Sequence, residues 1–336
     1  MVMNPPKRKI QAKSLNLNTS LTVKSAIEEF NRYQAANARS AQTAKTYSSS
    51  LHVFSLFFEK AFGSLAMPMV SLTKGSLVEE YVMYLRTERG NSDVSVAFHK
   101  RHLRVFLYWC MDRSYLPEQQ IVVKNPQEEV PEVYSEEEIN KLIKKPKTED
   151  FTENRNWVII NLMLATGNRR NTIANYKIGD VDFDDDYLIM NTTKSKKGQR
   201  IPISKKLRPV LKEYIATYRS DCKDDEPLFP SYLGEWISPN ALSKSLAEYN
   251  TKRGVEKTGM HLFRHTFAKD WVRSGGDSLT LQRILGHSSL AMTEKYVRLF
   301  GEDISGFVDR YASLGKYKSE NTTINTRTKI RKGGRH

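Results

Sequence analysis

The sequence predicts a mainly α-helical fold with a small antiparallel β-sheet (α+β), arranged in two domains. Three observations support this prediction. Apolar residues recur at helical spacing along most of the chain, segments 180–191 and 196–204 are typical of β-strands, and a proline-containing segment without apolar periodicity separates two helical regions. The length of 336 residues allows two domains that each bury a core of their own.

Residues 1–20 are predicted to form a flexible basic arm. They contain the proline pair Pro5 and Pro6 and no acidic residue. Their basic residues are Lys7, Arg8, Lys9 and Lys13. A stretch of this kind is suited to contact phosphate groups.

Residues 21–124 are predicted to form a four-helix domain, because four segments each carry apolar residues at the spacing of one helix face. These residues are Val23, Ile27 and Phe30; Tyr47, Leu51, Phe54 and Phe58; Val78, Tyr81, Val82 and Leu85; and Val96, Leu103, Phe106 and Leu107. The last segment also carries the basic residues His99, Lys100, Arg101 and Arg104. This basic cluster fits a face that follows a phosphate backbone and, equally well, an ordinary solvated helix surface.

Residues 125–134 are predicted to be a linker between domains, because two prolines interrupt a stretch without helical periodicity. Ser135 and Glu138 then have the spacing of a capping box, which predicts that a helix begins there. We expect a second domain over 135–315 and a loose basic tail over 316–336.

The second domain is predicted to be mostly helical with a minor sheet. The apolar run "WVIINLMLATG" indicates a buried helix that ends near Gly167. Segments 180–191 and 196–204 follow as the two strands of a small antiparallel hairpin. Helical spacing returns in four later segments, at 208–219, 240–250, 261–274 and 279–285.

Charge and composition indicate the class of partner. The chain has 53 Lys and Arg residues against 38 Asp and Glu, a net charge of +15, which favours nucleic acid before a membrane surface. Cys110 and Cys222 lack CxxC spacing, which argues against a disulfide framework and a thiolate zinc site. The N-terminus lacks the apolar region of a signal peptide, and the most apolar run is about half as long as a membrane helix. We therefore expect a cytoplasmic protein that associates with nucleic acid and not with a membrane.

Four places hold polar residues that apolar periodicity does not explain: Arg169, Lys194, "HLFRH" at 261–265 and "RILGHSSLAMTEKY" at 283–296. In isolation, Arg169 is typical of a surface charge and Lys194 of a basic turn. His261 and His265 have the i, i+4 spacing of zinc ligands. However, Leu262 occupies the position where the H-E-x-x-H motif requires glutamate, so no metal is expected.

An anionic substrate accounts for these residues better than a metal does. The planar guanidinium groups of Arg169 and Arg264 are suited to bind oxygens of the same phosphate. Tyr296 is the only member of the set that could act as a nucleophile. The remaining members are Lys194, His261 and His287. Together these residue types indicate phosphoryl transfer.

The motifs resemble those of the tyrosine recombinases, also called phage-type integrases. The resemblance rests on "ATGNRRNT", "TKSKKGQRIPI", "HLFRHTFA" and "ILGHSSLAMTEKY", whose order and spacing match the family throughout 135–300. Each motif is weak by itself, and the four together are specific. The helical region before them is similar to the core-binding domain of the family. The resemblance therefore implies a DNA-binding helical domain followed by a catalytic domain.

The resemblance also implies a mechanism. Tyr296 would attack a DNA phosphodiester, become joined to the 3′ phosphate and release a 5′ hydroxyl. Arg169 and Arg264 would bind the two non-bridging oxygens, and Lys194 would protonate the leaving oxygen. Two residues that could replace this lysine are Lys196 and Lys197.

The histidines receive separate expected roles from the resemblance. His261 would assist proton transfer at the tyrosine, and His287 would hydrogen-bond with the phosphate or orient its neighbours. His265 is expected to be structural. No cofactor, metal or ATP would be needed, because fixed cationic groups stabilise the transition state and the phosphotyrosine retains the energy of the broken bond.

Thr172 departs from the family pattern. The family commonly has an acidic residue three positions after its first arginine, where it supports the active site, and this chain has a threonine.

Two other functions are compatible with a basic two-domain chain: a catalytically silent DNA-binding protein and an enzyme similar to type IB topoisomerases. The complete set of six polar residues argues against the first, and the compact two-domain layout argues against the second.

The resemblance further implies partners and a role. The partner would be double-stranded DNA, on which four copies would assemble, with accessory DNA-bending proteins as further partners. The segment 302–336 would dock on a neighbouring subunit through an apolar helix face. The expected role is integration or excision of a phage or another mobile element.

Overall fold

The computed structural model describes residues 21–38, 40–73, 75–124, 126, 130–190 and 198–301. The chain divides between residues 129 and 130 into two compact units, and this division falls within the segment predicted as a linker. The predicted basic arm 1–20 and the predicted tail 316–336 lie outside the described residues.

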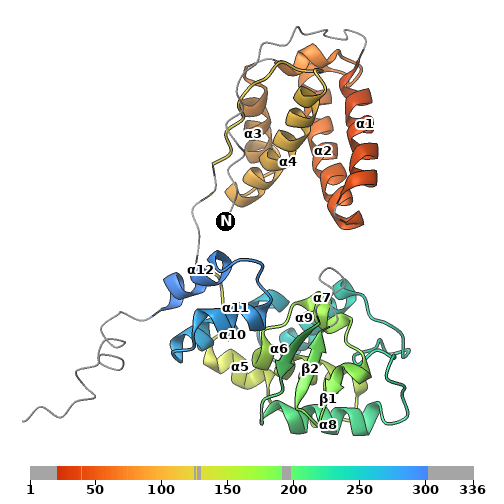
Figure 1. Ribbon diagram of the computed structural model, residues 1–336, viewed down its shortest axis with the longest axis vertical. Coiled ribbons are helices and arrows are strands. Elements are labelled where there is room, and N and C mark those ends of the chain that lie inside the picture. The colour runs from red at the N-terminus through yellow and green to blue at the C-terminus, as the bar shows by residue number, and fades with distance from the viewer. Residues whose placement is uncertain are drawn as a thin grey trace, which may run out of the picture. The chain divides into compact units, whose positions relative to one another are not determined.

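The first unit is built from helices at the four predicted positions (Figure 1). They are α1 (Val23–Asn37), α2 (Ala41–Phe62), α3 (Leu77–Thr87) and α4 (Asp93–Asp112), with the short 3-10 helix η1 (Met69–Thr73) before α3. Hydroxyl side chains cap three of the helices at their N-termini: Thr22 for α1, Ser40 for α2 and Ser92 for α4. The sequence therefore sets where these helices begin.

Aromatic side chains fill the core of this unit. The ring of Phe30 on α1 meets the rings of Phe106 and Trp109 on α4 edge to face, with centroids 5.4 Å apart in both pairs. Phe54 and Phe58 of α2 are fully buried in the same core. These contacts hold α4 against α1 and α2.

The predicted basic cluster on α4 is only partly exposed. Arg101 is exposed, whereas Lys100 and Arg104 are half-buried. His99 differs from the expectation of an exposed residue, because its Nδ1 lies 3.0 Å from the Ser50 hydroxyl of α2. Burial lowers the pKa of His99, so this side chain is a neutral contact between helices rather than a surface charge.

The second unit is mainly helical, as predicted, and includes a small sheet. Its helices are α5 (Glu136–Leu142), α6 (Phe151–Thr166), α7 (Arg170–Ala174), the 3-10 helix η2 (Ile178–Asp180), α8 (Leu207–Tyr218), α9 (Pro239–Lys252), α10 (Met260–Arg273), α11 (Ser278–Leu285) and α12 (Ala291–Phe300). The predicted capping box is confirmed: the Ser135 hydroxyl accepts from Glu138 N at 3.2 Å, and the Glu138 carboxylate accepts from Ser135 N at 2.7 Å.

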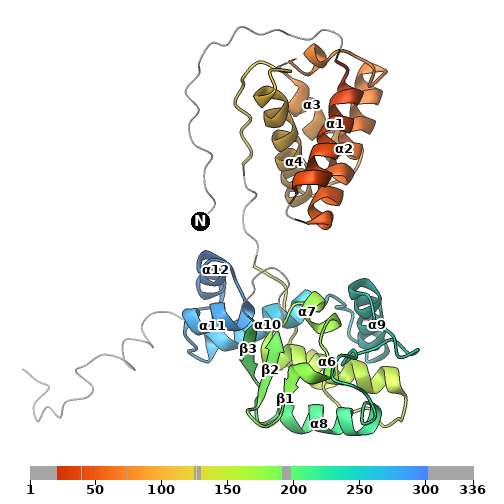
Figure 2. The ribbon, with the colours of Figure 1, turned by 45° about the vertical axis from the view of Figure 1, so that its right-hand side comes forward.

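Helix α6 lies at the centre of the second unit, where it packs against α8, α9 and α10 (Figures 1 and 2). The consecutive residues Trp157, Val158, Ile159 and Ile160 are all buried, so the helix is covered on every side. It ends at Gly167, which adopts a left-handed conformation. This confirms the buried helix predicted from the apolar run.

The sheet has three antiparallel strands, not the two that the sequence predicted. They are β1 (Val181–Asp182), β2 (Tyr187–Met190) and β3 (Gln199–Pro202), in the order β1-β2-β3. The predicted first strand is divided because the Asp182 carboxylate accepts from the backbone N–H groups of Asp184 and Asp185, each at 3.0 Å. Asp186 then takes a positive φ of 56° and turns the chain back into β2.

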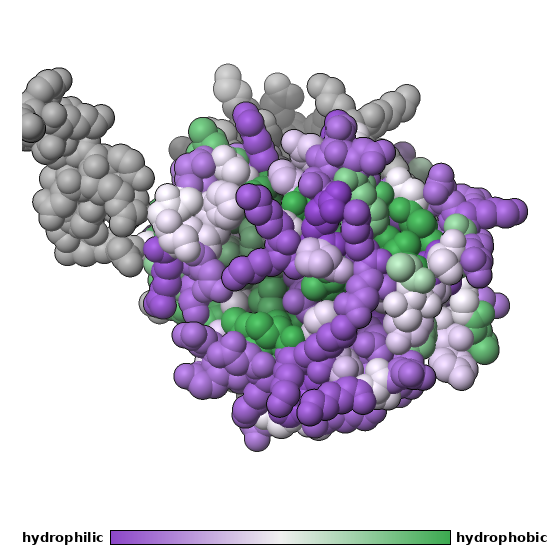
Figure 3. All heavy atoms as spheres, turned by 90° about the horizontal axis from the view of Figure 1, so that it is seen from below, coloured by the Kyte–Doolittle hydropathy of each residue, from purple (hydrophilic) through white to green (hydrophobic). Residues whose placement is uncertain are grey.

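Hydrophilic side chains cover most of the face shown in Figure 3, and apolar side chains form smaller patches between them. None of the helices in the described parts of the chain is both long and apolar enough to cross a membrane.

Candidate active site

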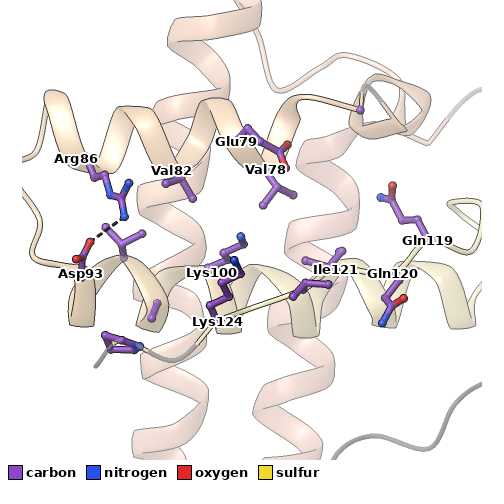
Figure 4. A pocket seen from close by; sticks show the side chains of 15 residues that line it. Val78, Glu79, Val82, Arg86, Asp93, Lys100, Gln119, Gln120, Ile121 and Lys124 are labelled. Atoms are coloured by element: carbon purple, nitrogen blue, oxygen red, sulfur yellow. Dashed lines mark hydrogen bonds and ion pairs between the residues drawn. The ribbon is translucent and has the colours of Figure 1, made fainter. Parts of the chain in front are cut away.

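A groove in the first unit lies between α3, α4 and the residues 119–122, Lys124 and Pro126 (Figure 4). Val78 and Ile121 supply apolar lining, while Lys100 and Lys124 supply positive charge. This groove contains no member of the predicted catalytic set. The predicted site residues that the structure describes lie instead in the second unit.

Five of the six predicted site residues lie in the described part of the second unit, at α7 and along the last three helices. Arg169 immediately precedes α7, His261 and Arg264 lie on α10, His287 follows α11, and Tyr296 lies on α12. Helices α10, α11 and α12 pack against one another (Figure 2). Lys194 and its alternatives Lys196 and Lys197 lie outside the described residues.

Gly167 brings the end of α6 close to α10 and α11. Its φ is +60°, and a Cβ atom at this position would lie 2.6 Å from a ring carbon of Phe267 and 2.7 Å from a methyl carbon of Leu285. Only glycine permits the end of α6 to lie so close to Phe267 and Leu285. This close packing places Arg169, two residues later, beside the end of α11.

We expect Gly167→Ala to lower the free energy of unfolding by about 2 to 5 kcal/mol, through left-handed strain and overpacking. Gly254→Ala is the matched control, because Gly254 has a φ of +66° and open space around the added Cβ. It should lose only the backbone contribution of about 1 to 2 kcal/mol. Urea unfolding measures both variants, and equal losses would show that the close packing at Gly167 contributes nothing.

The two arginines are fixed by backbone carbonyl groups. Arg264 donates to the carbonyl oxygens of Gly167 at 2.8 Å and Leu285 at 2.9 Å, and Arg169 donates to that of Gly286 at 3.1 Å. The end of α11 therefore supplies acceptors to both guanidinium groups. The negative end of this helix dipole favours the same arrangement.

Gln199, at the start of β3, also binds the end of α11. Its side-chain amide donates to the carbonyl oxygens of Arg283 and, at 3.3 Å, of Ile284. Gln199 thus ties the strand that follows the predicted lysine to the turn that carries His287. Sequence reasoning missed this residue, because a single glutamine in a basic hairpin gives no signal.

The arginine pair is positively charged and has no carboxylate partner among the described residues of the second unit. Within 130–190 and 198–301, neither Arg169 nor Arg264 forms an ion pair with an acidic side chain. Burial, followed by the charge of Arg169, lowers the pKa of Arg264 to about 10, so that it remains protonated at neutral pH. Thr172 adds no charge to this region. A buried cation without a counterion favours an anionic ligand.

Tyr296 is 6% exposed and lies close to the arginine pair. Burial raises the pKa of its phenol, while the positive charges of Arg264 and Arg169 act in the opposite direction. The phenol oxygen lies 2.7 Å from Nδ1 of His265. This contact differs from the structural role that the resemblance implies for His265, and the spacing of four residues from His261 is the only signal of it in the sequence.

The other two histidines surround the same region. The Nδ1 atom of His287 lies 2.8 Å from the hydroxyl of the fully buried Thr293, and its ring is parallel to that of Tyr296 with centroids 6.2 Å apart. Burial, then the charges of the two arginines, lowers the pKa of His287 to about 4. His261 is exposed, and its pKa is lowered by partial desolvation and by the charge of Arg170.

Both histidines are therefore neutral at pH 7 in the free protein. In this state they can donate or accept hydrogen bonds without adding charge. Among the described residues, no group of three or more His, Cys, Asp or Glu side chains could hold a metal ion. The site thus combines a buried phenol, two fixed cations and neutral imidazoles.

Known proteins are similar to this chain over most of its length. The sequence model of the phage integrase family matches residues 132–302. Tyrosine recombinase XerC of Thermodesulfovibrio yellowstonii is 26% identical, over 85% of this chain and 95% of its own. Tyrosine recombinase XerA of Pyrococcus furiosus is 28% identical, over 84% and 93%.

Solved structures share the fold. A lambda integrase tetramer bound to a Holliday junction matches with a TM-score of 0.66 and 15% identity, over 86% of this chain and 80% of that chain. The site-specific recombinase XerH, bound to a palindromic difH substrate in a post-cleavage complex, matches with a TM-score of 0.63 and 21% identity, over 87% and 84%. The family match covers more than half of the 336 residues. The chain therefore belongs to the phage integrase family and is a tyrosine recombinase, an enzyme that transfers DNA strands.

Proposed function

We propose that Tyr296 is the nucleophile of this recombinase and forms a 3′-phosphotyrosine link to DNA. The observation that carries this proposal is the buried Tyr296 hydroxyl beside two guanidinium groups that have no acidic partner in the described residues. Arg169 and Arg264 bind the non-bridging oxygens of the scissile phosphate. There they stabilise the charge that develops as the phenol attacks.

The remaining predicted residues complete the reaction. Lys194 protonates the leaving 5′ oxygen, with Lys196 or Lys197 as its alternatives, and His287 hydrogen-bonds with the phosphate. The resemblance implies that His261 assists proton transfer at the tyrosine, but it is exposed and the phenol oxygen lies 2.7 Å from His265 instead, so His261 is assigned a contact with the phosphate. Because His261 is exposed and His287 is neutral, both can approach an incoming phosphate without losing an ion pair. The phosphotyrosine keeps the energy of the broken bond, so a 5′ hydroxyl of another strand reseals the DNA without ATP.

We further propose that the protein acts in the cytoplasm on double-stranded DNA as a tetramer and integrates or excises a phage or another mobile element. The description of the matching family supports this role. The lambda integrase tetramer on a Holliday junction supports the assembly. The segment 302–336, for which we propose docking on a neighbouring subunit, lies outside the described residues.

Covalent trapping tests the proposed chemistry. The protein first selects its binding sequence from a pool of random duplexes, and the selected duplex is then nicked near the cleavage point so that the released strand diffuses away. We expect an adduct that survives detergent, forms in EDTA and maps to Tyr296 by mass spectrometry. Cleavage that stops in EDTA and leaves no adduct would instead identify a metal-dependent nuclease.

A further inference from the structure

His265 and Tyr296 meet where α10 packs against α12. The Nδ1 atom of His265 lies 2.7 Å from the phenol oxygen, and the ring centroids are 5.7 Å apart. This distance is that of a short hydrogen bond, so His265 contacts the atom that forms the new bond to phosphorus.

The charge state of His265 allows it to accept a proton at this contact. The side chain is half-buried, and its desolvation lowers its pKa below the usual value of 6.5. Electrostatic interactions with His261, Arg264 and Lys295 lower the pKa of His265 further. A neutral imidazole with its hydrogen on Nε2 has a free lone pair on Nδ1. The phenol, whose pKa is raised by burial, keeps its proton until attack.

We propose that His265 accepts the proton of the Tyr296 hydroxyl as the phenol oxygen attacks phosphorus. The O–H bond of Tyr296 breaks while its oxygen bonds to phosphorus, and the proton moves to Nδ1 of His265. The bond from phosphorus to the 5′ oxygen breaks, and that oxygen takes a proton from the acid proposed at Lys194. The reverse transfer restores the phenol on resealing. This inference rests on the proposed role of Tyr296.

The neighbouring histidines have other contacts. His287 directs Nδ1 to the hydroxyl of Thr293, and His261 lies at the exposed start of α10 beside Arg170. His261 and His287 can therefore contact the phosphate, and His265 is the histidine that contacts the phenol of Tyr296.

The test measures the single-turnover rate of adduct formation on a saturating nicked duplex. His265→Asn places an amide oxygen near the position of Nδ1, so it still accepts a hydrogen bond but is not a base. We expect the rate to fall by about 100-fold or more, with DNA affinity unchanged. His52→Asn is the matched control, because His52 is an exposed histidine of α2, and its rate should equal that of the wild type.

Fluorinated tyrosine at position 296 separates proton transfer from packing. Its phenol is more acidic and depends less on a base, so it should raise the rate of His265→Asn by about tenfold or more while changing the wild type little. An undiminished rate for His265→Asn would overturn the inference, as would a loss that fluorination does not relieve. A wild type that forms no adduct would refute the nucleophile assignment itself, which is a different outcome.

Discussion

Tyr296→Phe is expected to abolish covalent attachment to DNA while DNA binding persists. The substitution removes the hydroxyl oxygen that we propose as the nucleophile, so adduct formation should fall by more than about 10⁴-fold. The protein should still fold, because the phenyl ring keeps its buried position and its parallel packing against Phe300. The lost hydrogen bond to His265 costs about 1 kcal/mol. Denaturing gels report the adduct, and thermal unfolding reports the stability.

Tyr218→Phe provides the matched control for this substitution. Its hydroxyl lies on α8 and donates to the backbone carbonyl oxygen of Glu149 at 3.2 Å, outside the catalytic set. This variant should form adduct at the wild-type rate. An adduct that persists in Tyr296→Phe would mean that another residue is the nucleophile.

Arg264→Lys is expected to slow adduct formation by about 100- to 1000-fold although the positive charge is kept. The planar guanidinium donates to two carbonyl oxygens, those of Gly167 and Leu285, and retains further N–H groups for the phosphate. An ammonium group carries its three donors on one atom and does not match this fork. We expect the substitution to slow the chemical step itself, and the rate of adduct formation in a single turnover at saturating DNA measures this effect.

Arg155→Lys controls for the general cost of replacing a buried arginine. Arg155 is 2% exposed, against 5% for Arg264, and it donates to the carbonyl oxygen of Pro230 at 2.6 Å. Both variants should unfold at lower temperature, but only Arg264→Lys should lose its catalytic rate well below that temperature. Equal losses of rate in the two variants would attribute the effect to stability.

Local sequence patterns predicted most of the fold. The apolar run before Gly167 specified α6, and Ser135 with Glu138 specified the start of α5, because periodicity and capping act within a few residues. The division of one predicted strand into β1 and β2 was missed. It depends on side-chain hydrogen bonds from Asp182, which compete with the alternating pattern.

The sequence by itself determined the types and the order of the residues in the proposed site, because the motifs with Arg169, Arg264 and Tyr296 are each local. Only the tertiary structure decided how they meet. Carbonyl groups at the end of α11 accept hydrogen bonds from both arginines, and the phenol oxygen of Tyr296 contacts His265 rather than His261. These contacts join residues 21 to 117 positions apart in the chain. Such contacts depend on how the helices pack, and no local period or spacing encodes them.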